Sequence, residues 1–160
     1  MPLKTIDPIA QFMQEHDEAL VQLSSLNKAS KALVENGFTQ DAFFRLLRAV
    51  EFIEEEVGIH NKREEEALFP VLERYVEGPT KLMRDDHKVL AKEFRRLRRA
   101  VDRLTKNKTS KAAARDVEAV SRAIVQRMVN HIHKENHILF PLVQKFLTKD
   151  ALREVARRMV

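Results

Sequence analysis

The sequence repeats itself at an offset of 71 residues, and this repeat limits the chain to folds built from two similar halves. The tripeptide Leu-Phe-Pro ends at Pro70 and again at Pro141. Both prolines fall inside stretches with a helical pattern, where a proline costs about 3 kcal/mol and bends the helix. Finding this defect twice in the same tripeptide indicates a duplicated unit. The residues that share the offset are His16 and His87, His60 and His131, and Glu64 and Glu135.

Apolar residues recur with the period of an amphipathic helix in four long stretches, at about 8–36, 39–75, 80–107 and 110–146. A shorter stretch at about 149–159 has the same pattern. The chain has only 3 Gly and 5 Pro, so few turns are expected. These features predict an all-α fold: an antiparallel up-and-down four-helix bundle with a short C-terminal fifth helix, built from two helical hairpins related by a pseudo-twofold axis.

The length and composition fit one folded domain over residues 1–160, with 44% hydrophobic and 33% charged residues. We expect its core at about 8–147. The absence of Cys excludes disulfides, thiolate zinc sites, iron–sulfur clusters and Cys nucleophiles. No apolar run approaches the roughly 20 residues that span a bilayer. Met1–Pro8 also lacks the apolar core of a signal peptide, so we expect a cytoplasmic protein without a membrane partner.

Helical spacing directs ionisable side chains toward the apolar faces. Residues four apart project from the same face, so His60 points with Glu64, and their repeat counterparts do the same. Both pairs, and the histidines of the first and third helices, are predicted to lie on the apolar side of their helices. The apolar residues that share these faces are Ile53, Val57, Leu68, Val71 and Tyr75 around His60; Met128, Ile138 and Leu142 around His131; Ile9, Met13, Leu20 and Leu23 around His16; and Met83, Leu90, Phe94 and Val101 around His87.

Six ionisable side chains are thus directed into one bundle core, where they would be severely destabilising if unpaired. A hydrogen-bonded core histidine is the alternative for any one of them, but the shared offset and the duplicated tripeptide favour a joint function. Imidazole and carboxylate ligands without sulfur suit iron, manganese or zinc. Two inward glutamates can bridge two metal ions while two histidines complete each ion. The predicted metal ligands are His16, His60, Glu64, His87, His131 and Glu135.

Around these residues the sequence resembles the hemerythrin-like family, also called the HHE cation-binding domain. The matching segments are 12–17 (Phe-Met-Gln-Glu-His-Asp), 60–70 (His-Asn-Lys-Arg-Glu-Glu-Glu-Ala-Leu-Phe-Pro), Asp86-His87 and 131–141 (His-Ile-His-Lys-Glu-Asn-His-Ile-Leu-Phe-Pro). The resemblance implies a non-haem di-iron centre with two iron ions joined by an oxo or hydroxo bridge. It also implies the ligand assignment: His16 and His60 for one iron, His87 and His131 for the other, and Glu64 and Glu135 as bridges.

Two positions depart from the oxygen-carrying hemerythrins. Those proteins have a second His four residues after the His of the third helix, where this chain has Ala91. They also have an Asp five residues after the last His, where this chain has Glu135 at four. The missing imidazole leaves a position for water, hydroxide, an added ligand or another carboxylate. Reversible oxygen transport therefore becomes less secure, and chemistry with oxygen, peroxide or nitric oxide, or iron sensing, fits equally well.

The function expected from the sequence is a di-iron protein that binds or senses oxygen, nitric oxide or iron, and we favour a role without catalysis. The alternative is a small di-iron oxidase or peroxidase that uses the position left open at Ala91. Nucleic-acid binding is a third possibility, suggested by the net charge of +5 and the basic run at 95–111, but we expect that run to be a solvated face. The expected partner is a small diatomic molecule or peroxide, and the sequence indicates no oligomeric state.

Three further predictions concern residues near the six. Glu56 lies one turn before His60 and is a candidate to hydrogen-bond a ligand histidine. His133 and His137 are placed on the outer face of their helix as a solvated pair. Tyr75 is predicted to face inward, but it lies about 16 Å along the helix from the ligand glutamate and receives no role.

Overall fold

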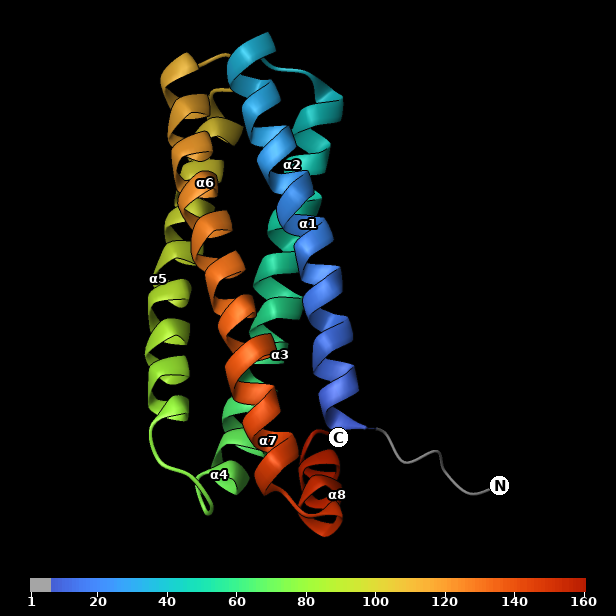
Figure 1. The fold of residues 1–160 in the computed structure, drawn as a ribbon. Helices are drawn as coiled ribbons and strands as arrows, with labels where there is room; N and C mark the ends of the chain where they lie inside the picture. Colours follow the sequence, from blue (N-terminus) through green and yellow to red (C-terminus); the bar gives the residue numbers. More distant parts are fainter. Residues whose placement is uncertain (1–6) are drawn as a thin grey trace, which may run out of the picture.

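The computed structural model describes Asp7–Val160, and almost all of these residues are helical (Figure 1). The described part contains no strand. Segments α2 to α4 together form the second long helix, and α6 to α7 the fourth; η1, η2 and η3 are π-helical. The segments are α1 (Pro8–Asn36), α2 (Gln40–Phe52), η1 (Ile53–Val57), α3 (Gly58–Arg63), η2 (Glu64–Leu68), α4 (Phe69–Leu72), α5 (Pro79–Lys106), α6 (Lys111–Lys134), η3 (Glu135–Leu139), α7 (Phe140–Phe146) and α8 (Lys149–Arg158).

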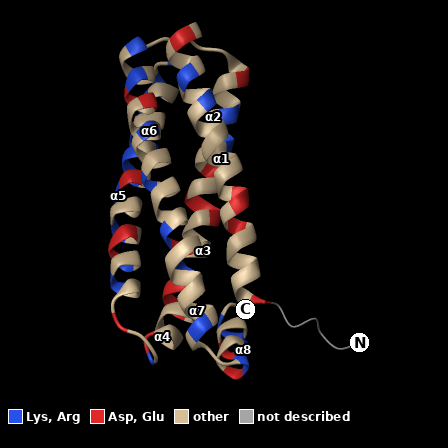
Figure 2. Cartoon of the chain, viewed as in Figure 1, with Lys and Arg blue, Asp and Glu red and all other residues tan. Residues whose placement is uncertain are grey.

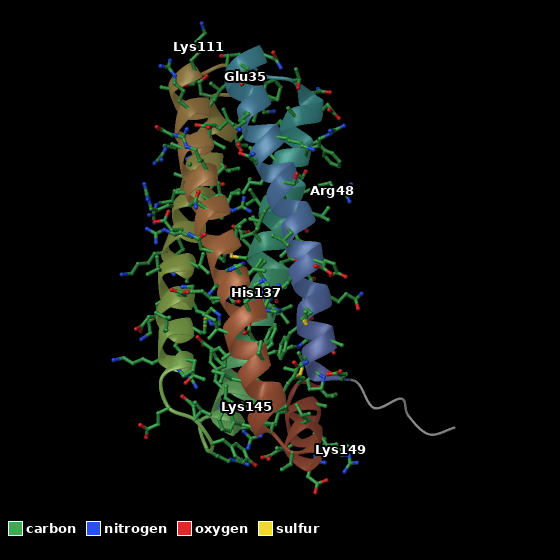
Figure 3. All side chains as sticks on the ribbon, in the orientation of Figure 1. Glu35, Arg48, Lys111, His137, Lys145 and Lys149 are labelled. Atoms are coloured by element: carbon green, nitrogen blue, oxygen red, sulfur yellow. The ribbon has the colours of Figure 1, made fainter. Side chains whose placement is uncertain are left out.

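The four long helices run side by side with alternating direction (Figure 1). α1 packs against α2 and α6, and α5 packs against α6. Figure 3 shows side chains filling the bundle along its length, with Glu35 and Lys111 at one end and Lys145 and Lys149 at the other. The predicted up-and-down bundle of two hairpins is therefore confirmed. Within Asp7–Val160, no helix combines the length and apolar character that crossing a membrane requires.

The helices begin close to where the sequence predicts, because side-chain oxygens accept hydrogen bonds from the free N–H groups of the first turn. Asp7 Oδ1 accepts from two such groups of α1, at 3.0 and 3.3 Å. Thr39, Ser110 and Thr148 cap α2, α6 and α8 in the same way. Gly37 follows α1 with a φ of +78°, a conformation that glycine adopts without strain.

A wide helical turn begins at each of the two predicted bridging glutamates. The N–H of Phe69 donates to the carbonyl of Glu64, and the N–H of Phe140 to that of Glu135, five residues back instead of four. The proline of each Leu-Phe-Pro comes next, so the wide turn lies where a regular helix would clash with the proline ring. The sequence predicted only a bend at these prolines; the structure accommodates each of them with one wider turn.

The wide turns rotate the residues that follow them, and this corrects two predictions. Ile138 is 53% exposed and Tyr75 is 45% exposed, although a regular helical wheel turns both inward. Val143 is fully buried after the second wide turn, and Tyr75 also lies beyond the end of α4. Met13 and Leu20 were predicted to face inward as well but are exposed, because they lie at one edge of the buried stripe of α1.

The buried apolar side chains form two clusters, one toward each end of the bundle. The predicted ligands separate them: on α1, Phe12 belongs to one cluster and Ala19 to the other, with His16 between. α8 joins the cluster at the end where α1 begins, through residues that include Ala151 and Val155. The fifth helix therefore closes that end of the bundle (Figure 1).

Candidate metal centre

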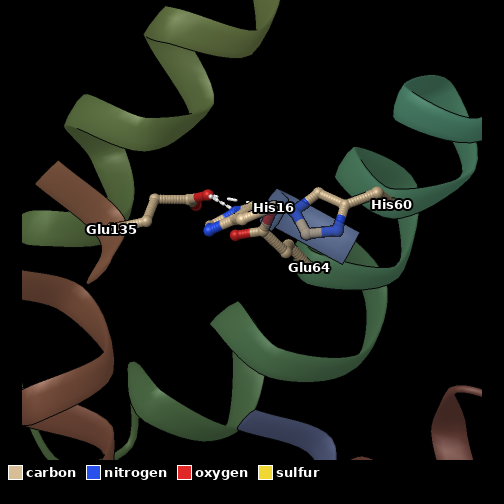
Figure 4. Close-up of side chains that lie close together, drawn as sticks. All are labelled: His16, His60, Glu64 and Glu135. Atoms are coloured by element: carbon tan, nitrogen blue, oxygen red, sulfur yellow. Dashed lines mark hydrogen bonds and ion pairs between the residues drawn. The ribbon is translucent and has the colours of Figure 1, made fainter. Parts of the chain in front are cut away.

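The structure brings the six predicted ligands together in the layer between the two apolar clusters. They form two overlapping groups of four, and the ligand atoms of each group lie within 4.8 Å of one another. Glu64 and Glu135 belong to both groups, which is the arrangement expected of two bridging carboxylates. Figure 4 shows the first group, completed by His16 and His60, with its side chains pointing toward one another. The second group is completed by His87 and His131.

All six side chains are buried. Glu64 and Glu135 have no exposed surface, and the most exposed of the four histidines is His60 at 7%. Burial of a charged group without partners costs several kcal/mol even after the surroundings relax. The stability of this layer therefore depends on the hydrogen bonds and opposite charges available to the six buried side chains.

Each of the four histidines directs Nδ1 outward to an acceptor oxygen. An Nδ1 that donates a hydrogen bond carries the ring proton, so a neutral ring keeps a lone pair on Nε2, directed to the centre. Acceptors of this kind fix the tautomer and orientation of most metal-ligating histidines. The contacts are His16 with Asn136 Oδ1 at 2.7 Å, His60 with Glu15 Oε1 at 2.9 Å, His87 with Glu65 Oε1 at 3.0 Å, and His131 with Asp86 Oδ2 at 3.0 Å.

The inner nitrogens approach one another in pairs. Nε2 of His16 lies 3.1 Å from Nε2 of His60, and Nε2 of His87 lies 3.2 Å from Nε2 of His131. If Nδ1 of both rings carries the proton and both rings are neutral, the two Nε2 lone pairs face each other, so a proton or a cation must lie between the nitrogens. His60 and His131 can supply that proton in the metal-free chain, and a metal ion that replaces it binds to both nitrogens, so the donor set fits a metal ion.

The two carboxylates are short of partners. Both oxygens of Glu64 and Oε2 of Glu135 are buried without a hydrogen bond to any described residue, and His60 Nε2 approaches Glu64 Oε1 to 2.5 Å without hydrogen-bond geometry. Burial and the charge of Glu135 raise the pKa of Glu64 well above its ordinary value. Burial also opposes ionisation of Glu135, but hydrogen bonding with Glu64 and with nearby histidines outweighs it and holds the pKa of Glu135 well below its ordinary value. Without a cation, burial and mutual repulsion therefore oppose the ionisation of both carboxyl groups at once.

The histidines respond to the same surroundings in different directions. Burial opposes a charged His60, but three carboxylates, Glu64 foremost, raise its pKa well above the ordinary value. Burial also opposes a charged His131, but Glu135 and Asp86 outweigh it and raise the pKa of His131. For His87, burial and the neighbouring His131 dominate and lower the pKa. A metal ion must displace the protons that His60 and His131 retain, so metal binding is coupled to proton release.

The phenylalanine of each Leu-Phe-Pro covers a predicted ligand of the other hairpin. Phe69 stacks on His87 with ring centroids 5.8 Å apart, and Phe140 stacks on His16 at 5.4 Å. Both phenylalanines are buried. Each Leu-Phe-Pro is therefore linked to two predicted ligands. The wide turn before its proline begins at a ligand glutamate, and its phenylalanine restrains a ligand histidine of the other hairpin.

A cavity of about 30 Å³, the first cavity, lies beside His16 and His60 and is bordered by α1, η1, α3 and α6. This volume holds one water-sized or diatomic molecule. Its outer part is lined by Glu18, Glu56 and Arg63. The first cavity therefore offers a small ligand a place next to two of the predicted metal ligands.

Glu56, a candidate for a hydrogen bond to a ligand histidine, does not make that contact, and the four outer acceptors were missed. Glu56 lines the first cavity, while Glu15 of α1 takes the hydrogen bond to the ligand histidine. A wheel drawn for one helix cannot show a partner on a neighbouring helix. The repeat carried the missing signal, because Glu15 and Asp86 precede paired histidines, and Glu65 and Asn136 follow the paired glutamates.

Ala91 is exposed and lines a surface groove of about 490 Å³ with Gly58 and Phe94, and it does not line the first cavity. The coordination position left open at Ala91 stays a prediction. The first cavity is the space that the structure provides beside the centre.

The remaining candidates lie on the surface. His133 and His137 are exposed with ring centroids 4.3 Å apart, as expected for a solvated pair. The basic residues of 95–111 are exposed except for half-buried Arg98, whose guanidinium binds Glu54 at 2.6 Å. Figure 2 shows basic and acidic residues interspersed along α5. The run is therefore exposed along α5, and its expected role as a solvated face stays a prediction.

Fold and site together define a four-helix bundle with a buried histidine–carboxylate layer suited to binding metal. The chain belongs to the hemerythrin HHE cation binding domain family, whose family model matches residues 7–143 and again residues 78–160. The second match begins 71 residues after the first, so it reproduces the offset of the internal repeat. No curated protein matches the chain significantly.

Proposed function

We propose that the chain is a single hemerythrin-like domain that holds two non-haem iron ions in the layer between its apolar clusters. His16 and His60 hold one ion and His87 and His131 hold the other. Glu64 and Glu135 bridge the two. Iron is preferred over manganese and zinc because of the family, since the donor atoms alone suit all three metals.

One observation carries this proposal: all four histidines turn Nδ1 to an acceptor oxygen away from the centre and Nε2 toward the centre. The inner nitrogens lie in pairs, and Nε2 of His16 also lies 3.0 Å from Oε1 of Glu135. Three carboxylate oxygens of the layer have no hydrogen-bond partner among the described residues. Two divalent cations supply the positive charge that these atoms need.

When bound, two iron ions supply a redox-active pair that can take up a small ligand. The chain's own residues orient and protect that pair. Outer acceptors such as Glu15 and Asp86 fix the imidazole rings, the stacked phenylalanines limit their movement, and the apolar clusters above and below exclude bulk water. The first cavity has room for oxygen, nitric oxide or peroxide beside His16 and His60.

We favour binding or sensing of oxygen, nitric oxide or iron over catalysis. The carboxylates nearest to the centre are committed, because Glu15, Glu65 and Asp86 each accept a hydrogen bond from a ligand histidine. These three carboxylates orient ligands, a role that metal binding requires with or without catalysis. The alternative is a small di-iron oxidase or peroxidase, which would consume oxygen or peroxide over many turnovers.

Iron retention tests the ligand assignment. Glu64→Ala and Glu135→Ala each remove a bridge and should release most of the iron, whereas His133→Ala removes an exposed imidazole and should retain it. Iron per chain is measured after loading with ferrous iron and gel filtration. Equal retention in all three variants contradicts the assignment.

The small-ligand role is tested on the loaded protein. We expect stoichiometric and reversible changes in its visible absorption on addition of nitric oxide or oxygen, without continued consumption of either gas. Sustained consumption of oxygen or peroxide supports the oxidase or peroxidase alternative. An unchanged spectrum with every gas leaves iron sensing as the binding role, which a dependence of chain stability on ferrous iron would support.

A further inference from the structure

The internal repeat provides a comparison for the first cavity. A second cavity, of about 140 Å³, lies beside His131, and six of the seven residues that line it are the 71-residue counterparts of residues lining the first. The two cavities therefore occupy equivalent places in the two halves of the bundle. Differences in charge and depth between the two cavities indicate which kind of ligand can enter each half.

The two cavities carry opposite charge. Three carboxylates and one guanidinium line the first cavity, whereas one carboxylate and two cationic side chains line the second. Two positions account for most of the difference: Glu18 is replaced by Val89, and Glu56 by Arg127. A divalent cation is attracted to the first cavity and repelled by the second.

The first cavity also reaches further into the centre. Its lining includes His16 and His60, both buried, and His131 from the other half, whereas the second cavity touches only His131 among the predicted ligands. On the inner wall, Ala19 of the first cavity stands where the second has the bulkier Leu90. The wide turn η1 contributes Glu56 and Val57 to the first cavity, while the equivalent stretch 124–128 is regular helix in α6.

We propose that the first cavity is the route by which ferrous iron reaches the centre, with Glu18 and Glu56 attracting the ion and passing it to His16 and His60. This inference rests on the proposed di-iron function. A chain with a net charge of +5 repels cations on the whole, so an acidic opening decides where they approach. Transfer between the two halves then takes place inside the layer, through the shared glutamates.

The test measures the rate of iron uptake by the metal-free chain under anaerobic conditions, with unbound ferrous iron trapped at intervals by a chromogenic chelator. The variant Glu18→Gln/Glu56→Gln removes two charges from the opening. We expect it to load about tenfold more slowly than the parent at low salt and to reach the same final iron content. The parent's rate should fall with ionic strength, and the variant's should change little.

A charge-matched control is Glu51→Gln/Glu55→Gln, which removes two exposed carboxylates outside both cavities and should load like the parent. Glu56→Arg introduces the residue that the second half carries and should load more slowly still. Equal rates for parent and opening variants, with equal final iron, overturn this inference and leave the di-iron proposal intact. A folded parent that takes up no iron overturns both.

Discussion

Nε2 of His16 lies 3.1 Å from Nε2 of His60, although Nδ1 of each ring already faces an acceptor oxygen. The pseudo-twofold axis reproduces this relationship in the second hairpin, with 3.2 Å between the corresponding nitrogens of His87 and His131. Inside the buried layer, a proton or a metal ion between the paired nitrogens holds each pair together, so metal and protons compete for the same atoms.

The outer acceptors should control metal affinity. Glu15→Ala and Asp86→Ala each free the Nδ1 of a ligand histidine, so each should weaken metal binding by about 10–100-fold. Competition with a chelator of known affinity measures the change. The exposed neighbour Asp17 supplies the control, since Asp17→Ala should leave affinity unchanged. A comparable loss in the control would show that the outer hydrogen bonds are not responsible.

Removing one buried carboxylate should stabilise the metal-free chain while it impairs metal binding. Glu64→Gln keeps the shape of the side chain and removes the carboxyl whose pKa is raised by burial and by Glu135. We expect the metal-free variant to gain about 1–4 kcal/mol in the free energy of unfolding by urea. A metal-free variant that is less stable than the parent would mean that the two carboxyl groups stabilise the layer without metal.

A rise in pH should lower the stability of the metal-free chain and strengthen its binding of metal. The pKa values of His60 and His131 are raised in the folded chain, so their stabilising contribution is complete below their ordinary value of 6.5 and is lost as pH rises through the folded value. The raised pKa of Glu64 acts in the same direction above 4.5. The lowered pKa values of His87 and Glu135 change stability only below 6.5 and 4.5.

Between about pH 6.5 and pH 9, the metal-free chain should therefore lose stability as pH rises, whereas metal binding should become tighter because fewer protons have to be displaced. Urea unfolding of the metal-free chain and chelator competition of the loaded chain measure the two trends. Parallel trends in both experiments would contradict the coupling of metal to these protons.

The stacked phenylalanines should matter for both stability and metal. Phe140 is buried against His16, so Phe140→Ala should lower the free energy of unfolding by about 3–5 kcal/mol and weaken metal retention. The control is Phe146→Ala, which changes the exposed last residue of α7 and should cost far less. Phe69→Leu preserves most of the apolar volume beside His87 and separates loss of packing from loss of stacking. Full metal retention in Phe140→Ala would contradict a role of the stacked ring at the centre.

The sequence predicted the bundle and all six candidate ligands because both depend on periodicity. The 71-residue offset pairs His16 with His87 and Glu64 with Glu135 without reference to any fold. Helical spacing then determines which faces are apolar, and six polar residues on apolar faces need a common explanation. Local sequence patterns are thus sufficient to predict the regular helices and the residues that face the core.

Two kinds of feature were out of reach of these patterns. Wide turns at η2 and η3 shift the register, so a wheel with a constant angle placed Ile138 and Tyr75 inward when they are exposed. Hydrogen bonds between helices depend on the rotation and separation of the helices, so the sequence offered Glu56 as a candidate for a contact that Glu15 makes. The duplicated Leu-Phe-Pro marks the positions of the wide turns. The 71-residue repeat marks the residues that make the hydrogen bonds between helices.

The most direct test of the central claim is the iron content of the tag-free chain, loaded anaerobically with ferrous iron, freed of excess by gel filtration and measured by elemental analysis. We predict about two iron ions per chain, one for each pair of inward histidines. A folded chain that retains no iron would contradict the claim and would identify the buried layer as a polar core without metal.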